Sequence, residues 1–169
     1  LAIIDKNPNY GYALGLQFQK YNLLDMAIKA FQKSMELNPA LNFNFQLARI
    51  YGEQGNVEAM YNSYLNLVID GKTSKSNILR SIDDFVSEEP ENQNNILLKK
   101  VLLERAQKNP DILWNELLSW LFEKQNQYGS AFRQEKAIFK RMNGSSTSRL
   151  ENLGQSALEN EEYEIAKDI

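Results

Sequence analysis

A short pattern that recurs along the chain constrains its fold more than any other feature. A bulky residue followed by a small one occurs at Leu14-Gly15, Leu47-Ala48 and Leu153-Gly154. Three further positions are counted from the small residue. An aromatic residue or Ala lies three positions after it, a turn residue lies seven positions after it, and a slender apolar residue lies twelve positions after it. The first two copies begin 33 residues apart (14 to 47), a period typical of a repeated helix-turn-helix unit. Because such a unit cannot bury its own apolar face, its neighbours must stack into a solenoid.

Helical periodicity fills the stretches between the few Gly and Pro residues, so the sequence predicts an all-α chain. The expected helices cover residues 9–21, 23–37, 41–53, 56–69, 75–88, 93–108, 111–125, 127–142, 146–159 and 161–169. Each Asn-Pro pair predicts a helix end, because the residue before proline is pushed away from helical backbone. These pairs are Asn7-Pro8, Asn38-Pro39 and Asn109-Pro110.

The predicted architecture is an α-α superhelix of about ten helices in one repeat domain over residues 1–169. Its units span approximately residues 8–40, 41–70, 75–110, 111–143 and a partial unit 146–169, while residues 1–7 end a preceding repeat. The third unit is degenerate, with a longer turn near residues 88–95, and a local insertion without functional meaning is the alternative. Gly71 to Ser74 predict a loop that ends in an N-cap serine. Both chain ends lie inside a repeat, so we expect a fragment of a longer array.

The composition excludes several kinds of chemistry. The chain contains neither His nor Cys, which removes thiolate and imidazole nucleophiles and the usual zinc ligands. Its net charge of −3 argues against nucleic-acid binding, since such proteins usually carry a basic excess. No apolar run approaches the ~20 residues that span a bilayer. We therefore expect no enzyme, no cofactor, no metal site, no nucleic-acid partner and no membrane-spanning segment.

The repeated residues resemble the tetratricopeptide repeat, whose pattern combines Leu-Gly or Leu-Ala, an aromatic residue or Ala, a turn, a further Ala and Pro. The first unit matches at Leu14, Gly15, Phe18, Ala27, Phe31, Ser34 and Pro39, and the second at Leu47, Ala48, Tyr51, Gly55, Met60 and Tyr64. A third matches at Leu118, Ser119, Phe122, Tyr128 and Ala131, and the last at Leu153, Gly154, Ala157, Tyr163 and Ala166. Two departures are Met60 in place of Ala and Glu135 in place of an aromatic residue.

The small residues of this pattern are expected to let the two helices of a unit approach closely; they are Gly15, Ala27, Ala48, Gly154 and Ala166. The aromatic residues are expected to fill the gap to the next unit; they are Phe18, Phe31, Tyr51 and Tyr64. The usage of Asn, Lys, Ile and Tyr also resembles that of tetratricopeptide proteins from Bacteroidota. That resemblance implies a bacterial protein in the periplasm or cell envelope, with the cytoplasm as the alternative.

The resemblance implies a non-enzymatic scaffold for protein–protein interaction that binds a partner peptide or helix on the concave face of the first helices. On this chain that face holds Tyr12, Leu16, Asn42, Phe45, Arg49, Glu116, Trp120 and Lys124. Phe45 and Trp120 are the strongest candidates, because aromatic residues dominate binding hot spots. The alternative is that both belong to the core. The clamp by which chaperone-binding members hold a C-terminal carboxylate is absent, since its positions are occupied by Tyr12, Leu16 and Gln46.

Other interpretations stay open at this point. The chain could be an assembly or regulatory subunit of a cell-envelope complex, or the non-catalytic region of a larger enzyme. Exposed repeat ends are expected to favour self-association. A basic group within residues 127–142 predicts either an anion-docking stripe or a solvated face near a helix C-terminus; it comprises Arg133, Lys136, Lys140 and Arg141. Glu88, Glu89 and Glu91 beside Pro90 lack the pattern of a calcium loop and predict a solvated turn.

Overall fold

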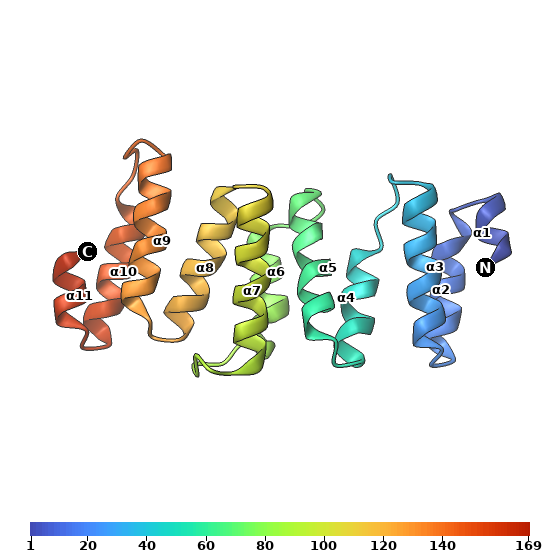
Figure 1. Cartoon of the computed structure of the whole chain (residues 1–169), viewed down its shortest axis with the longest axis horizontal. Coiled ribbons are helices and arrows are strands. Elements are labelled where there is room, and N and C mark those ends of the chain that lie inside the picture. Colours follow the sequence, from blue (N-terminus) through green and yellow to red (C-terminus); the bar gives the residue numbers. More distant parts are fainter. The chain divides into compact units, whose positions relative to one another are not determined.

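The computed structural model describes residues 1–169 as helices joined by short turns, without strands (Figure 1). The helices are α1 (Ala2–Lys6), α2 (Tyr10–Lys20), α3 (Leu24–Leu37), α4 (Asn44–Glu53), α5 (Val57–Ile69), α6 (Lys75–Ile82), η1 (Asp83–Phe85), α7 (Gln93–Lys108), α8 (Ile112–Lys124), α9 (Tyr128–Arg141), α10 (Ser148–Glu159) and α11 (Tyr163–Asp168). Consecutive helices pack as pairs: α2 with α3, α4 with α5, α8 with α9, and α10 with α11. The predicted all-α class of paired helices is confirmed.

The chain divides into two compact units, Leu1–Ser81 and Ile82–Ile169. The first, unit 1, contains α1 to α5 and all of α6 except its last residue. The second, unit 2, contains η1 and α7 to α11. Each unit is described by itself below.

Left-handed backbone marks the turns inside the helical pairs. The three turn residues of the repeated pattern all have positive φ: 56° at Asn22, 71° at Gly55 and 63° at Glu161. Asn126 adds a fourth turn of this kind, with a φ of 55°. This conformation brings a Cβ close to the following carbonyl, so glycine, which has no Cβ, adopts it most readily. Asparagine tolerates it because its short polar side chain can form local hydrogen bonds. The predicted turn positions are thus confirmed.

The Asn-Pro pairs end helices as predicted. Asn7, Asn38 and Asn109 have extended backbone at the ends of α1, α3 and α7. The side-chain oxygens of the first two residues accept hydrogen bonds from the backbone N–H groups two residues on, at 3.0 and 3.1 Å. Such Asx turns replace the helical hydrogen bonds that proline interrupts.

The helix predicted over residues 75–88 is wrong in its second half. Helix α6 ends at Ile82, a short 3-10 turn follows, and Val86 is extended. The cause is Asn95, whose buried side chain accepts a hydrogen bond from the Ser87 N–H at 3.2 Å and donates to the Ser87 carbonyl at 2.9 Å. It also donates to the Glu89 carbonyl at 2.7 Å. These bonds satisfy backbone groups that a continued helix would have paired internally.

Close approach between α2 and α3 depends on glycine. A Cβ at Gly15 would overlap the ring of Phe31, and a Cβ at Gly11 would overlap the side chain of Ser34. The expected role of Gly15 is therefore confirmed, and Gly11 shares it. At Gly154 a Cβ would meet Ile169 at 3.4 Å, which is ordinary contact, so glycine is not required there.

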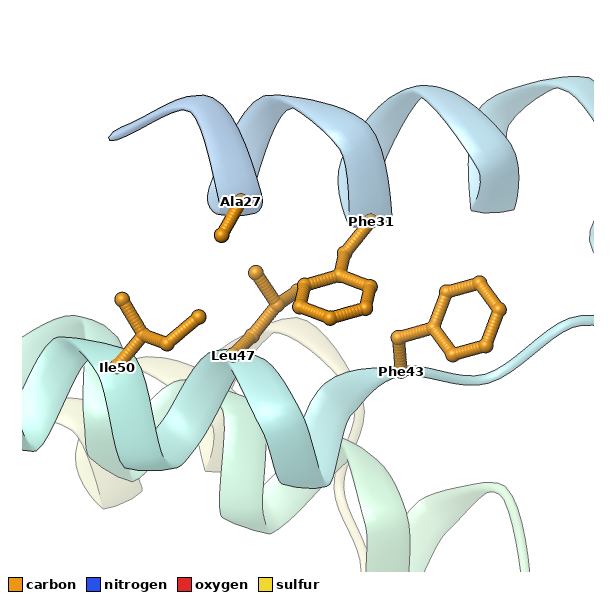
Figure 2. Close-up of a cluster of buried hydrophobic side chains, with 5 residues drawn as sticks. All are labelled: Ala27, Phe31, Phe43, Leu47 and Ile50. Atoms are coloured by element: carbon orange, nitrogen blue, oxygen red, sulfur yellow. The ribbon is translucent and has the colours of Figure 1, made fainter. Parts of the chain in front are cut away.

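A layer of apolar side chains joins the first helical pair of unit 1 to the second. Figure 2 shows Ala27 and Phe31 of α3 facing Leu47 and Ile50 of α4, with Phe43 at the start of α4 completing the cluster. The rings of Phe31 and Phe43 lie 5.3 Å apart between centroids. All five side chains are buried, and partly buried Phe18 and Tyr51 pack against them. The predicted role of the aromatic residues in filling the space between repeats is confirmed here.

Candidate functional site

Four of the predicted partner-binding side chains are exposed on α2 and α4 of unit 1. Tyr12 and Leu16 lie one turn apart on α2, and Phe45 and Arg49 lie one turn apart on α4. Tyr12, Leu16 and Phe45 are 45, 38 and 49% exposed. Residues four apart share one side of a helix, so each pair forms a continuous strip. We call these four residues the α2–α4 face.

The Tyr12 ring connects α2 to the beginning of α4. It stacks on Phe43 with the ring centroids 5.8 Å apart and an angle of 28° between the planes. Phe43 is itself buried against Phe31, so one side of the tyrosine ring rests on the core. The stacking on Phe43 therefore fixes the orientation of the exposed tyrosine ring.

Phe45 belongs to the surface of unit 1, not to its core. Its ring meets the ring of buried Tyr64 edge to face, with the centroids 6.5 Å apart. Burial raises the pKa of the Tyr64 hydroxyl, and the positive charge of nearby Arg49 partly offsets that rise. Of the two interpretations that the sequence left open for Phe45, the structure is compatible with the exposed one.

Phe45 also forms one wall of an open cavity of about 510 Å³ between α4, α5 and α6. We call it the Phe45 cavity; its other lining residues are Leu67, Lys72, Thr73, Asn77, Ile78, Arg80 and Ser81. No carboxylate lines it, whereas two cationic side chains do. Sequence reasoning missed Lys72 and Arg80, because it treated residues 71–74 as a connector and α6 as part of a degenerate unit.

Asn42 has a structural role at the start of α4. Its side-chain amide donates a hydrogen bond to the Asp70 carboxylate at 2.6 Å. Its side-chain oxygen accepts hydrogen bonds from the backbone and side chain of Asn44, both at 3.1 Å. These contacts tie the first turn of α4 to the loop after α5, so Asn42 supports the helix that carries Phe45 and Arg49.

The three predicted residues of unit 2 lie at successive turns of α8 and are less accessible. Glu116 forms an ion pair with Arg149 at 3.1 Å, and Lys124 forms one with Asp83 at 2.9 Å. Trp120, between them, is partly buried. Both charges are thus already compensated within unit 2, which distinguishes this strip from the α2–α4 face.

A network of carboxylates surrounds Arg149 in unit 2. Its guanidinium holds the buried carboxylate of Glu135 through two hydrogen bonds of 2.7 and 2.6 Å, which raise the pKa of Arg149. Burial raises the pKa of neighbouring Glu123, although a hydrogen bond from Ser119 at 3.2 Å partly offsets this. The departure of Glu135 from the aromatic pattern was the only sequence signal of this network.

The basic group on α9 interacts largely with its own unit. Arg133 donates to Ser130 at 2.8 Å, Arg141 donates to Asn115 at 3.1 Å, and the Lys136 ammonium lies 4.9 Å from the centre of the Phe132 ring. All four basic side chains are exposed, which is compatible with a solvated face.

Glu88, Glu89 and Glu91 are exposed in a turn, and no group of acidic side chains is placed to hold a metal ion. None of the helices has the length and hydropathy needed to cross a bilayer.

Comparison with protein-family models gave no match, and comparison with curated protein sequences gave no significant match. The resemblance to the tetratricopeptide repeat therefore depends on the residues named above and on the paired helices.

Proposed function

We propose that this chain is a non-enzymatic protein–protein interaction scaffold of the tetratricopeptide type. In this proposal a partner peptide or helix binds across the α2–α4 face. The observation that carries it is the exposure of Tyr12, Leu16 and Phe45 on the first helices of two neighbouring pairs. Large apolar side chains gathered on adjacent helices favour a binding surface over a surface that faces water alone.

The chemistry of the face also supports a protein ligand. Aromatic and arginine side chains provide most of the free energy at protein interfaces, and the face offers Tyr12, Phe45 and Arg49. The two aromatic rings already rest on Phe43 and Tyr64. Because these contacts restrict the rings before binding, little further side-chain entropy is lost when a partner covers them.

A random-peptide phage library panned on the purified chain tests this proposal. We expect the native chain to enrich binding peptides and Phe45→Ala to lose them. Tyr21→Ala provides a matched control, because Tyr21 is 68% exposed at the end of α2 and lies outside the face. Circular dichroism confirms that each variant keeps its helices. Equal enrichment by the native chain and Phe45→Ala, or no enrichment by any form, contradicts the proposal.

A further inference from the structure

We infer that the Phe45 cavity selects an acidic peptide segment, with an apolar side chain of the segment inside the cavity and its carboxylates beside Lys72 and Arg80. This inference rests on the proposed function, because Phe45 belongs to both the α2–α4 face and the cavity. It specifies the partner class: an internal stretch of polypeptide in which Asp or Glu residues flank an apolar residue.

The walls of the cavity are suited to an apolar anchor. Phe45 contributes a half-exposed ring, and the buried side chains of Leu67 of α5 and Ile78 of α6 also line the cavity. Its volume of about 510 Å³ falls within the range of about 300–1,000 Å³ that is usual for ligand pockets. Covering the Phe45 ring with an apolar side chain removes both surfaces from water, which favours binding.

The charges at the cavity are uncompensated. Arg80 donates a hydrogen bond to the Asn77 side-chain oxygen at 2.7 Å and another to the Ser76 carbonyl at 3.4 Å, so neutral groups hold its guanidinium. Lys72 forms no ion pair. The carboxylate of the same loop, Asp70, accepts its hydrogen bond from Asn42 and does not line the cavity. The cavity is therefore a positive site on a chain with a net charge of −3.

The backbone fixes the position of this positive site. The N–H of Lys72 donates to the Leu67 carbonyl at 2.9 Å, and Gly71 adopts a φ of 64°, so the chain turns sharply at the end of α5. The N–H of Asn77 donates to the Ser74 hydroxyl at 3.3 Å, which caps the start of α6 as the sequence predicted. Lys72 and Arg80 are therefore attached to an ordered loop and helix, and binding needs little backbone reordering.

The same observations favour a peptide over a nucleic acid. Nucleic-acid grooves combine a basic track with several aromatic side chains on which successive bases stack. Here two cations line the cavity together with one aromatic ring and two aliphatic side chains. An apolar anchor flanked by carboxylates matches this combination of surfaces.

Charge reversal in the same phage experiment tests the inference. We expect the native chain to enrich peptides in which Asp or Glu flank an apolar residue. Lys72→Glu/Arg80→Glu should lose these peptides and enrich peptides rich in Lys and Arg. Lys6→Glu/Lys29→Glu is the matched control, because it changes the net charge of unit 1 equally and both residues are exposed away from the cavity. Displayed peptides that are fused through their carboxyl ends carry no free C-terminal carboxylate, so enrichment of acidic peptides reports Asp and Glu side chains.

The affinity of each variant for one enriched acidic peptide measures how much Lys72 and Arg80 contribute to binding. Fluorescence anisotropy should show an affinity loss of about tenfold or more for the charge-reversed variant, since two ion pairs are lost and repulsion replaces them. If that variant fails to fold, Lys72→Gln/Arg80→Gln serves instead, and its binding should depend less on salt than that of the native chain.

The possible failures are distinguishable. A native-chain pool without acidic residues overturns the inference and leaves the proposed function standing. No pool from any form contradicts the proposed function, and the inference fails with it. A fluorescein-labelled oligothymidylate that binds through Lys72 and Arg80, where acidic peptides do not, overturns the inference in favour of a nucleic acid.

Discussion

Arg149 of α10 holds Glu135 of α9 in a two-pronged ion pair, with Nε–Oε2 and Nη2–Oε1 distances of 2.7 and 2.6 Å. The carboxylate is 3% exposed, whereas the arginine side chain is 37% exposed. The pair therefore joins a buried anion to a cation that reaches the surface. Its geometry provides both carboxylate oxygens with donors, which is what a buried carboxylate requires.

Removing the cation alone should destabilise unit 2. Arg149→Ala leaves the Glu135 carboxylate buried without its partner, and we expect a loss of about 2–4 kcal/mol in the free energy of unfolding. Urea denaturation followed by circular dichroism measures this loss. This expected loss is smaller than that for a fully buried ion pair, because the Arg149 side chain is partly exposed to water.

A double variant provides the control for this pair. In Glu135→Leu/Arg149→Leu neither charge remains, and apolar side chains occupy the position where the repeat pattern has an aromatic residue. Replacing a buried pair in this way is often neutral or stabilising, so the double variant should be more stable than Arg149→Ala. If the double variant were the less stable of the two, the pair would contribute net stability and the argument from desolvation would be wrong.

Glu123 should make the stability of unit 2 depend on pH. Burial raises the pKa of its carboxyl above the ordinary 4.5, so the folded chain binds this proton more tightly than the unfolded chain does. Stability from this group is therefore gained as the pH falls through the raised pKa and lost as the pH rises through it. Glu123→Gln should be more stable than the native chain at pH 7, and the difference should shrink toward pH 4.5.

Thermal melts of both proteins across this range measure the effect. Ser119→Ala provides a second test, because it removes the hydrogen bond that favours the ionised carboxylate. That variant should show a steeper loss of stability with rising pH than the native chain. A constant difference between Glu123→Gln and the native chain at every pH would contradict the prediction.

Much of the fold follows from local chemistry that the sequence displays. Asn38 ends a helix because proline follows it, and Asn22 and Gly55 turn the chain because they accept positive φ. These effects act within a few residues, so they can be read without knowing the rest of the structure. The second half of the predicted helix 75–88 failed because its conformation depends on Asn95, eight residues beyond Ser87.

The candidate site was less predictable for a related reason. Phe45 and Trp120 both belong to one predicted face, yet the first is half exposed and the second partly buried, since exposure depends on which other elements cover a helix. Lys72 and Arg80 carry no motif. They line a cavity with Phe45 only because the loop after α5 and the short α6 place them there.

Replacing glycine with alanine should have opposite effects at Gly15, where a Cβ would overlap another side chain, and at Gly129, where a Cβ has room. Gly15→Ala should cost about 1–3 kcal/mol, because its Cβ would overlap the buried ring of Phe31 and force α2 away from α3. Gly129→Ala is the matched control in α9. Its Cβ would lie 3.6 Å from Ile165, so the helix propensity of alanine should stabilise it by about 0.5–1 kcal/mol. Urea denaturation of the two variants should therefore give changes of opposite sign.

Asn95 should govern the turn between η1 and α7. Asn95 is 1% exposed, and its side chain bonds to the backbone of both Ser87 and Glu89. Asn95→Ala leaves the Ser87 N–H and carbonyl without this partner, whereas the Glu89 carbonyl keeps its bond from the Asn92 N–H. We expect a loss of about 1–3 kcal/mol in urea denaturation and faster hydrogen exchange of the Ser87 amide. Asn92→Ala is the control, because the Asn92 side chain caps α7 through the Asn94 N–H at 2.9 Å, while the bond from Asn92 to the turn, to the Glu89 carbonyl at 3.0 Å, comes from its backbone and is kept in the variant. It should lower stability by about 0.5–2 kcal/mol while the Ser87 amide stays protected. Unchanged exchange of that amide in Asn95→Ala would mean that the turn is held by other contacts.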